Sequence, residues 1–410
     1  MIFVPSASIV ILGAARTPQG PLDGALKGFR ATQLGAFAIS GALKKAGVTP
    51  ERVDECIMGN VVSAGLMQAP AKQAAVAAGI PRERPSKTVN TLCASGMTAV
   101  WDACLALQSG LSKVVAAGGM ESRSNVPYYL GPFTEDGRRL PGKVRGAKFQ
   151  MQVPGRGAAA DEYKRFVEKI QSAGVREASI LDSLMCPFTP NFAMKDYAVK
   201  YAEARGISID EVNAAAGESY RKARAARDSG AFAGEIIPAG DVRDDDIISE
   251  KEEADLKAIS YGYVTAYNAP ALGDGASAAV LALEETAESL GVEPQARIRA
   301  LSRVDTPPEG FVHAPVDAVG EVERATGAKA TIVEANESFG LQIPAFRREF
   351  GAVELNPFGG AVALTHPVGA SGCRVIVTLM NAMKRLGHKH GAATICFGSG
   401  GATAIAVEAI

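Results

Sequence analysis

Residues 90–96 read Asn-Thr-Leu-Cys-Ala-Ser-Gly, and residues 366–372 read His-Pro-Val-Gly-Ala-Ser-Gly. Both stretches end in Ala-Ser-Gly, a small-residue step from an extended segment into an amphipathic, helix-like run. The first places Cys93 just before the expected helix, and the second places His366 close to the start of the other helix. We interpret the two stretches as copies of one element in a duplicated fold.

The sequence around the two stretches supports a duplication. Asn60 follows one strand-like run and Asn336 follows another, and in both cases the Ala of Ala-Ser-Gly comes 34 positions later (60 to 94 and 336 to 370). Each expected helix is then followed by a strand-like run and a glycine-rich turn, at residues 118–119 and 398–401. The shared order of elements makes an internal repeat the better explanation.

Short β-branched runs alternate with alanine- and leucine-rich amphipathic stretches along both halves. Strands are predicted over residues 9–12, 55–58, 114–117, 331–334, 394–397 and 404–408. Helices are predicted over residues 32–46, 97–109 and 374–386, each with a glycine near its end that suits a C-cap (Gly47, Gly110 and Gly387). This alternation is typical of an α/β fold.

A region of different composition separates the halves. Residues 135–156 are rich in glycine, proline and basic side chains, and residues 209–228 have a helical pattern. Residues 263–266 and 277–283 return to strand-like patterns. We therefore predict an N-terminal half formed by residues 1–124 and 258–290, an inserted loop domain over residues 125–257, and a C-terminal half over residues 291–410.

Composition narrows the classes of function. The chain has 410 residues, and its 43 basic and 44 acidic side chains give a net charge of −1, so no global field favours nucleic acid or an anionic membrane. The apolar run at residues 2–13 lacks a preceding basic region and fits a buried strand better than a signal peptide. No run approaches the ~18 apolar residues of a membrane span, so we expect a cytoplasmic protein.

Six cysteines are scattered without a CxxC pair, which argues against a zinc site and a secreted disulfide framework. Cys93 is the one that faces an expected helix N-terminus, where free N–H groups favour thiolate over thiol, although a buried apolar role is the commoner fate of such a residue. Pro367 keeps His366 out of the helix and on a loop. Cys396 ends an apolar strand just before the turn containing Gly398, whose backbone N–H groups can hold an oxyanion.

These residues also carry a family resemblance. The sequence resembles the thiolases (acetyl-CoA acetyltransferases and 3-ketoacyl-CoA thiolases) over essentially its whole length. Residues 90–96 resemble the nucleophile motif, Asn336-Glu337-Ser338-Phe339 the NEAF box, residues 359–367 the GHP box, and Cys396-Phe397-Gly398 the CxG box. The resemblance implies a five-layered αβαβα fold of two similar halves with a loop domain, which agrees with the duplication.

The resemblance also implies roles. Cys93 would take the acyl group as a thioester, and His366 would activate it. His366 and a water held by Asn336 would form one oxyanion hole, and the backbone N–H groups of Cys93 and Gly398 the other. Cys396 would remove a proton from the α-carbon of the second thioester. The implied activity is acyl transfer between coenzyme A thioesters in lipid and fatty acid metabolism, with coenzyme A as substrate or product, no other cofactor and no metal, in a homodimer or homotetramer.

The departures from the family pattern lie where the substrate would bind. Thr365 stands where the family usually has a glycine, and Tyr267 and Pro270 replace a glycine and a serine in the coenzyme A-binding stretch. The predicted substrate-binding residues are Met194, Arg243, Tyr267, Pro270 and Phe339. Basic residues that could hold the phosphates of coenzyme A are Lys143, Arg145, Lys148, Lys195 and Arg243.

Two other functions remain open from the sequence. One is a condensing enzyme of the ketoacyl-synthase or hydroxymethylglutaryl-CoA synthase kind, against which the second thiol, Cys396, argues. The other is a non-catalytic thiolase-like protein that binds acyl chains or partners without turnover, which the loss of the usual serine at Pro270 leaves open. Retention of all four candidate catalytic residues argues against it.

Overall fold

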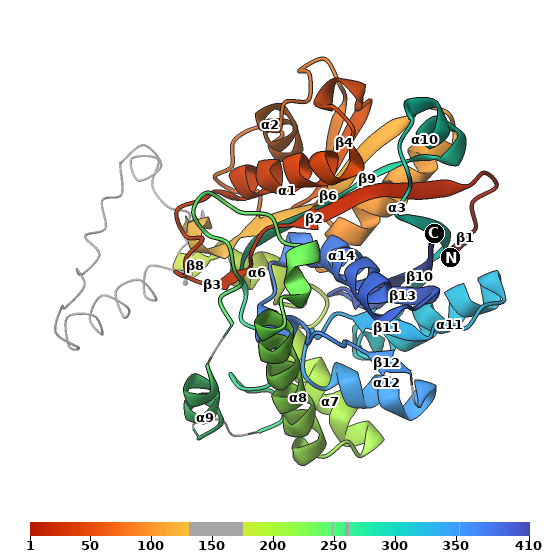
Figure 1. Ribbon diagram of the computed structural model, residues 1–410. Helices are drawn as coiled ribbons and strands as arrows, with labels where there is room; N and C mark the ends of the chain where they lie inside the picture. Colours follow the sequence, from red (N-terminus) through yellow and green to blue (C-terminus); the bar gives the residue numbers. More distant parts are fainter. Residues whose placement is uncertain (131–174, 248, 259–261, 352) are drawn as a thin grey trace, which may run out of the picture.

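The structure, a computed structural model, describes residues 1–130, 175–247, 249–258, 262–351 and 353–410 (Figure 1). The strands of its first half are β2 (Ile9–Arg16), β4 (Glu55–Gly59), β5 (Ser86–Val89), β6 (Val114–Ser122) and β9 (Gly273–Leu283). They lie side by side in the order β5-β4-β6-β9-β2. The pairs β4–β5 and β4–β6 are parallel, whereas β6–β9 and β2–β9 are antiparallel.

The second half repeats this arrangement strand for strand. Its strands are β10 (Ala296–Asp305), β11 (Ile332–Ala335), β12 (Glu354–Leu355), β13 (His390–Cys396) and β14 (Gly401–Ala409), in the order β12-β11-β13-β14-β10. The pairs β11–β12 and β11–β13 are parallel, and β13–β14 and β10–β14 are antiparallel. Both halves therefore have the same strand order and directions, and β2 pairs with β10 where they join. The predicted duplicated α/β fold is confirmed.

Helices cover and separate the two halves in layers (Figure 1). The helices α1 (Ala31–Ala46) and α2 (Pro70–Ala77) pack on the outer face of the first half, and α11 (Ala314–Thr326) packs on that of the second, beside α12 (Gln342–Phe350). Between the halves lie α3 (Ser95–Gln108) and α14 (Val368–Leu386). The result is the expected five-layered αβαβα arrangement.

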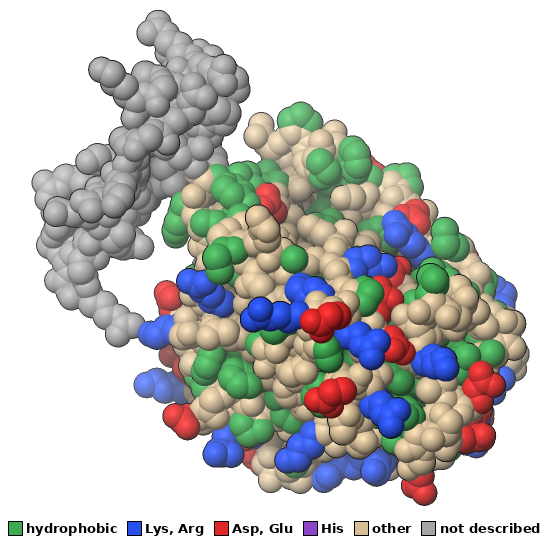
Figure 2. Space-filling model, turned by 90° about the horizontal axis from the view of Figure 1, so that it is seen from above, with side chains coloured by type: hydrophobic (Ala, Val, Ile, Leu, Met, Phe, Trp, Pro, Cys, Tyr) green, Lys and Arg blue, Asp and Glu red, His purple; other side chains and the backbone are tan. Residues whose placement is uncertain are grey.

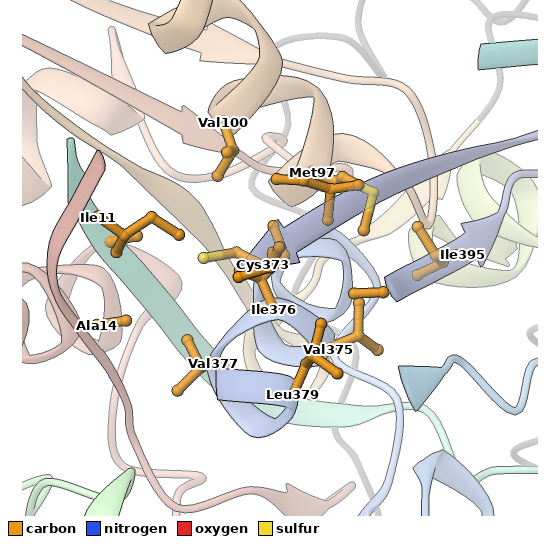
Figure 3. Packing of buried hydrophobic residues seen from close by; sticks show 14 of the residues in the cluster. Ile11, Ala14, Met97, Val100, Cys373, Val375, Ile376, Val377, Leu379 and Ile395 are labelled. Atoms are coloured by element: carbon orange, nitrogen blue, oxygen red, sulfur yellow. The ribbon is translucent and has the colours of Figure 1, made fainter. Parts of the chain in front are cut away.

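Burial on both faces of the strands explains why the sequence shows continuous apolar runs. Along β2, Ile9 and Ile11 belong to the central core, whereas Val10 and Leu12 belong to the core beneath α1. Successive strand residues point to opposite faces, so a strand with helices on both sides needs apolar residues at every position. Figure 3 shows the central core, where Met97 and Val100 of α3 lie near Cys373 and Ile376 of α14.

The two central helices approach closely at the glycines of the repeated tripeptide. A Cβ added to Gly96 would lie 2.7 Å from the backbone nitrogen of Cys373, and one added to Gly372 would lie 2.5 Å from that of Met97. Each glycine therefore leaves room for the backbone of the opposite helix. This contact brings the N-termini of α3 and α14 together, and with them the loops that carry Cys93 and His366.

The inserted region leaves the first half after β6 and returns at β9. Among the described residues, its helices are α6 (Ala178–Ser183), α7 (Met194–Arg205), α8 (Ile209–Asp228) and α9 (Glu250–Ala258). Helix α8 packs against α12 and α13 (Ala361–Leu364) of the second half, so the insertion reaches across to the other repeat. The prediction of a strand-like return at residues 263–266 was wrong, because these residues lie in a turn that Asn268 closes by accepting the Thr265 N–H.

The remaining elements of the described residues are short. They are β1 (Ile2–Phe3), which pairs with β10, β3 (Gly20–Pro21), which pairs with β9, the two-stranded sheet of β7 (Tyr128–Leu130) and β8 (Val175–Glu177), and helix α10 (Glu284–Leu290). The same part of the chain contains the short 3₁₀ helices η1 (Pro50–Arg52), η2 (Arg123–Asn125), η3 (Ala231–Gly234) and η4 (Pro308–Gly310).

The surface carries both signs of charge. Figure 2 shows basic and acidic side chains interspersed on one face, in keeping with the near-zero net charge. Within the described ranges, no helix is long and apolar enough to cross a bilayer.

Candidate active site

One cavity of about 650 Å³ collects the candidate catalytic residues from both halves. Cys93 comes from the loop before α3, His366 from the loop before α14, and Cys396 from the end of β13. Gly398, in the turn between β13 and β14, also lines the cavity. The close contact of α3 with α14 therefore places residues that are far apart in the sequence at one site.

Cys93 sits on a strained turn. Leu92, directly before it, has φ of 50°, a left-handed conformation that costs a bulky residue roughly 1–3 kcal/mol. The hydroxyl of Ser95 holds the turn, because it accepts a hydrogen bond from the Thr91 N–H at 2.9 Å and donates one to the Leu92 carbonyl at 2.6 Å. The turn directs the Cys93 side chain, which is partly exposed, into the cavity.

The Cys93 thiol needs a base to become a nucleophile. Burial raises the pKa of the Cys93 thiol above its ordinary value, and the nearby Cys396 raises it further. The backbone N–H of Gly398 donates toward the Cys93 sulfur and acts in the opposite direction on the pKa. That N–H is one of the two donors that the sequence assigned to an oxyanion hole.

His366 can supply the base. Its Nδ1 lies 2.6 Å from the Ser371 hydroxyl, which donates its own hydrogen to the Pro367 carbonyl at 3.0 Å. Ser371 therefore accepts from Nδ1–H, and we infer that Nε2 carries the free lone pair. Nε2 has no hydrogen-bond partner among the described residues. Burial, with a smaller contribution from Arg374, lowers the His366 pKa to about 3, so the imidazole is neutral near neutral pH.

Cys396 is the second thiol of the cavity. Its sulfur lies 3.0 Å from the hydroxyl of Ser338. Burial raises the pKa of Cys396 to about 11, while the contact with Ser338 acts to lower it. The turn that follows has positive φ at Ser399, Gly400 and Gly401, and a Cβ on Gly400 would meet the Thr306 carbonyl oxygen at 2.1 Å. The glycine-rich sequence is thus required for the tight turn that carries Gly398.

Asn336 lies directly behind the cavity wall rather than in it. It is 1% exposed, its Nδ2 donates to Ser338 Oγ at 3.1 Å, and its Oδ1 accepts from Arg374 at 3.2 Å. Arg374, on α14, also forms a fully buried ion pair with Glu334 at 2.7 Å. Asn336 is therefore held in one amide orientation by groups on both sides.

Three of the predicted substrate-binding residues line the cavity, namely Met194, Pro270 and Phe339. Tyr267 does not, because the residue is 2% exposed, its ring packs at a tilt against Tyr220, and its hydroxyl donates to Glu253 at 3.2 Å. Arg243 is exposed on a loop and is also absent from the lining.

Of the predicted phosphate-binding residues, some line the cavity and others do not. Lys195 lines the cavity. Lys143, Arg145 and Lys148 lie outside the described residues. Arg123, which sequence reasoning missed, lines the cavity as well and pairs with Glu177 at 3.2 Å.

Thr365, which stands in place of the usual glycine, has φ of 69°, and its Oγ1 is buried without a hydrogen-bond partner in the described part of the chain. A β-branched residue is unfavourable in that conformation, so the loop before His366 is strained.

Sequence reasoning also missed several supporting residues. Ser338, Ser371 and Arg374 orient Cys396, His366 and Asn336, respectively. Glu121 accepts hydrogen bonds from the backbone N–H groups of Val61 and Gly369, both at 3.0 Å, and so ties the two halves together under the site. The sequence could have indicated only Ser338 and Ser371 as supporting residues, since each carries a hydroxyl and lies close to a candidate catalytic residue in the sequence.

Comparison with known proteins identifies the family. Residues 9–285 match the thiolase N-terminal domain, and residues 292–409 match the thiolase C-terminal domain. The chain belongs to the thiolase family. It is 36% identical to the mitochondrial acetyl-CoA acetyltransferase of Rattus norvegicus, covering 98% of this chain and 91% of the relative. It is 35% identical to the acetyl-CoA acetyltransferase of Cupriavidus necator, with 98% and 99% covered.

Solved structures agree. The Bacillus anthracis acetyl-CoA acetyltransferase superposes with a TM-score of 0.85 at 28% identity, with 100% of both chains covered. The Acat5 thiolase of Ascaris suum, solved in complex with coenzyme A, gives a TM-score of 0.83 at 31% identity, covering 98% of this chain and 100% of the other. The predicted thiolase chemistry, acyl transfer between coenzyme A thioesters, is confirmed at the level of the family.

Proposed function

We propose that this thiolase is an acetyl-CoA acetyltransferase that works through an acyl-Cys93 intermediate. The observation that carries the proposal is the meeting of Cys93, His366 and Cys396 in one cavity, with the Gly398 N–H directed at the Cys93 sulfur. The relatives named acetyl-CoA acetyltransferase support acetyl-CoA as the acyl donor.

In the first half-reaction, His366 Nε2 takes the proton of Cys93. The thiolate attacks the thioester carbonyl, and the oxyanion is held by the backbone N–H groups of Cys93 and Gly398. The C–S bond to coenzyme A breaks, the acyl group stays on Cys93, and the coenzyme A sulfur leaves as a thiol after taking a proton from Cys396.

In the second half-reaction, the Cys396 thiolate removes a proton from the α-carbon of a second acyl thioester. The enolate oxygen is stabilised by protonated His366 and by a water held by Asn336. The α-carbon attacks the acyl-Cys93 carbonyl, the C–S bond to Cys93 breaks, Cys93 takes its proton back from His366, and a 3-ketoacyl thioester forms. Thiolysis is the same sequence reversed.

The lining supports an acyl chain on coenzyme A. Its apolar residues surround the reacting groups and include Ile180, Leu184, Met194, Leu272, Phe311, Phe339 and Val368. Lys195 and Arg123 supply positive charge for the phosphates of the carrier. We also propose a cytoplasmic homodimer or homotetramer. Residues 66–75, which include the exposed Met67, resemble the stretch that builds subunit contacts in the family, and light scattering would test the assembly.

The test is intact-protein mass spectrometry after brief incubation with acyl-CoAs, from acetyl upward. We expect an acetyl adduct on the wild-type protein and none on Cys93→Ala. An adduct that survives in Cys93→Ala would disprove the assigned nucleophile, and preferential loading by a longer chain would disprove the acetyl preference.

A further inference from the structure

Ser338 occupies the position between the proposed acid/base thiol and the amide of Asn336. It follows β11, whereas Cys396 ends the neighbouring parallel strand β13, with Ala335 paired to Thr394. Because the carboxyl ends of these strands meet at one edge, the two side chains reach each other, with 3.0 Å between Ser338 Oγ and Cys396 Sγ. Ser338 is 8% exposed and lines the cavity.

A buried chain of polar groups fixes the direction of this hydrogen bond. Arg374 can only donate, so its contact at 3.2 Å turns the oxygen of the Asn336 amide toward it. The amide nitrogen then faces Ser338 and donates to Oγ at 3.1 Å. Since Ser338 Oγ already accepts from Asn336, its own hydrogen is free to point at the Cys396 sulfur.

We propose that Ser338 is a positioning residue for the acid/base step, whose hydroxyl donates to Cys396 Sγ and stabilises the thiolate that takes the α-proton. The proposal rests on the function proposed for Cys396. A donor to the charged form favours that form, which opposes the effect of burial on the thiol. When Cys396 takes the proton, an S–H bond forms, a C–H bond breaks, and Ser338 keeps its own proton.

Other ionisable groups also face the cavity around Cys396. Cys93 comes from the loop before α3, His366 from the loop before α14, Arg123 from η2, and Lys195 and Asp196 from α7. None of these changes when Ser338 is replaced. A shift in the behaviour of Cys396 in a Ser338 variant is therefore due to the lost hydroxyl.

The test measures Cys396 directly. In a Cys93→Ala background, the protein is alkylated with iodoacetamide at fixed pH below the thiol pKa, and the rate at Cys396 is read by peptide mapping. Loss of one charge-assisted hydrogen bond should raise the thiol pKa by about one unit, making thiolate tenfold scarcer. Because a thiolate of higher pKa is also more nucleophilic, Ser338→Ala should slow alkylation roughly three- to fourfold.

Two further variants control this result. Ser338→Thr keeps a hydroxyl and should restore the parental rate. Ser302→Ala removes another buried hydroxyl, which donates to the Ala318 carbonyl, and should change nothing at Cys396. Circular dichroism checks folding of each variant. An unchanged rate in Ser338→Ala, or an equal loss in Ser338→Thr, would overturn the proposal.

A second readout uses the enzyme with Cys93 intact. Ser338→Ala should still form the acetyl adduct on Cys93, while condensation slows roughly three- to fourfold and recovers as the pH rises. Condensation unchanged at all pH values would count against the positioning role. Failure of the proposed function would look different, as absent acylation of Cys93 in the wild type, whereas the alkylation result needs no turnover.

Discussion

The two Ala-Ser-Gly turns show how one scaffold serves two purposes. In the first half, the Ser95 hydroxyl bonds to the backbone of the turn before it, at Thr91 and Leu92. In the second half, the Ser371 hydroxyl donates a hydrogen bond to the Pro367 carbonyl and accepts one from the Nδ1–H of the His366 ring. Ser95 begins α3 and closes the turn before it, whereas Ser371 lies in the first turn of α14, where its hydroxyl supports the ring of a base.

The paired asparagines differ in the same way. In the first half, Asn60 Nδ2 donates to the Met120 carbonyl and to Glu121, so its donors face protein acceptors. In the second half, Arg374 binds the oxygen of Asn336, and the amide nitrogen faces Ser338 at the cavity wall. The carboxylate of Glu121 thus binds the amide nitrogen of Asn60, whereas the guanidinium of Arg374 binds the amide oxygen of Asn336. As a result, it is the Asn336 amide nitrogen that faces the cavity wall.

The largest expected effect separates the two thiols. Cys396→Ala should still form the acetyl adduct on Cys93 but lose condensation by a factor of roughly 10²–10⁴, the usual contribution of a general base. Mass spectrometry measures the adduct, and a coupled assay measures condensation. Condensation near the wild-type rate would mean that another group removes the α-proton.

The next effect concerns the contact between the repeats. Gly96→Ala and Gly372→Ala should each lower the unfolding free energy by roughly 1–3 kcal/mol or more, because the new Cβ meets the backbone of the opposite helix. Denaturant midpoints measure this. Gly28→Ala is the control, since no atom of the described residues lies within 4 Å of its Cβ position. Midpoints equal to that of Gly28→Ala would contradict the reciprocal contact.

Replacing the paired serines tests their different roles. Ser371→Ala should lower the acylation rate roughly 10- to 100-fold, because the ring of His366 loses the partner that orients it. Ser95→Ala should mainly lower stability, by about 1 kcal/mol for a lost hydrogen bond. Acylation kinetics and denaturant midpoints are compared for both. If both variants lose acylation rate equally, the two serines have the same role and the proposed difference is wrong.

The halves should respond oppositely to pH. The His366 pKa falls to about 3, so between its ordinary value of 6.5 and about 3 the unfolded chain binds more protons, and stability is lost as pH falls. Burial raises the Glu121 pKa from 4.5 to about 7, so its contribution is lost as pH rises through that range. The free energy of unfolding is measured as a function of pH. His366→Asn should reduce the loss of stability as pH falls, and Glu121→Gln should reduce the loss of stability as pH rises. Identical pH profiles for both variants would refute this.

The smallest effect concerns the strained residue before His366. Thr365→Gly should raise the unfolding free energy by about 1 kcal/mol, because glycine accepts a φ of 69° without steric cost and removes an unpartnered hydroxyl. A denaturant midpoint at or below the wild type would mean that the loop is not strained. The first half offers a contrast in Leu92, whose φ is 50° but whose side chain packs against two hydrophobic clusters, so Leu92→Gly loses that burial and should not stabilise the protein.

The sequence by itself determined the duplicated α/β fold, most element positions and the residues that gather at the site. Apolar periodicity, capping glycines and the repeated Ala-Ser-Gly are local signals, and α8 begins and ends at the predicted residues, Ile209–Asp228. The cavity then follows from the repeat, since equivalent loops meet where the central helices cross.

Only the tertiary structure decided which way individual side chains face. Tyr267 was expected at the substrate but turns toward Tyr220 and Glu253, and residues 263–266 form a turn rather than a strand. The chain from Arg374 through Asn336 and Ser338 to Cys396 joins elements distant in sequence. Such hydrogen bonds depend on how strands and helices pack against one another. The residues that form them therefore show no pattern in the local sequence.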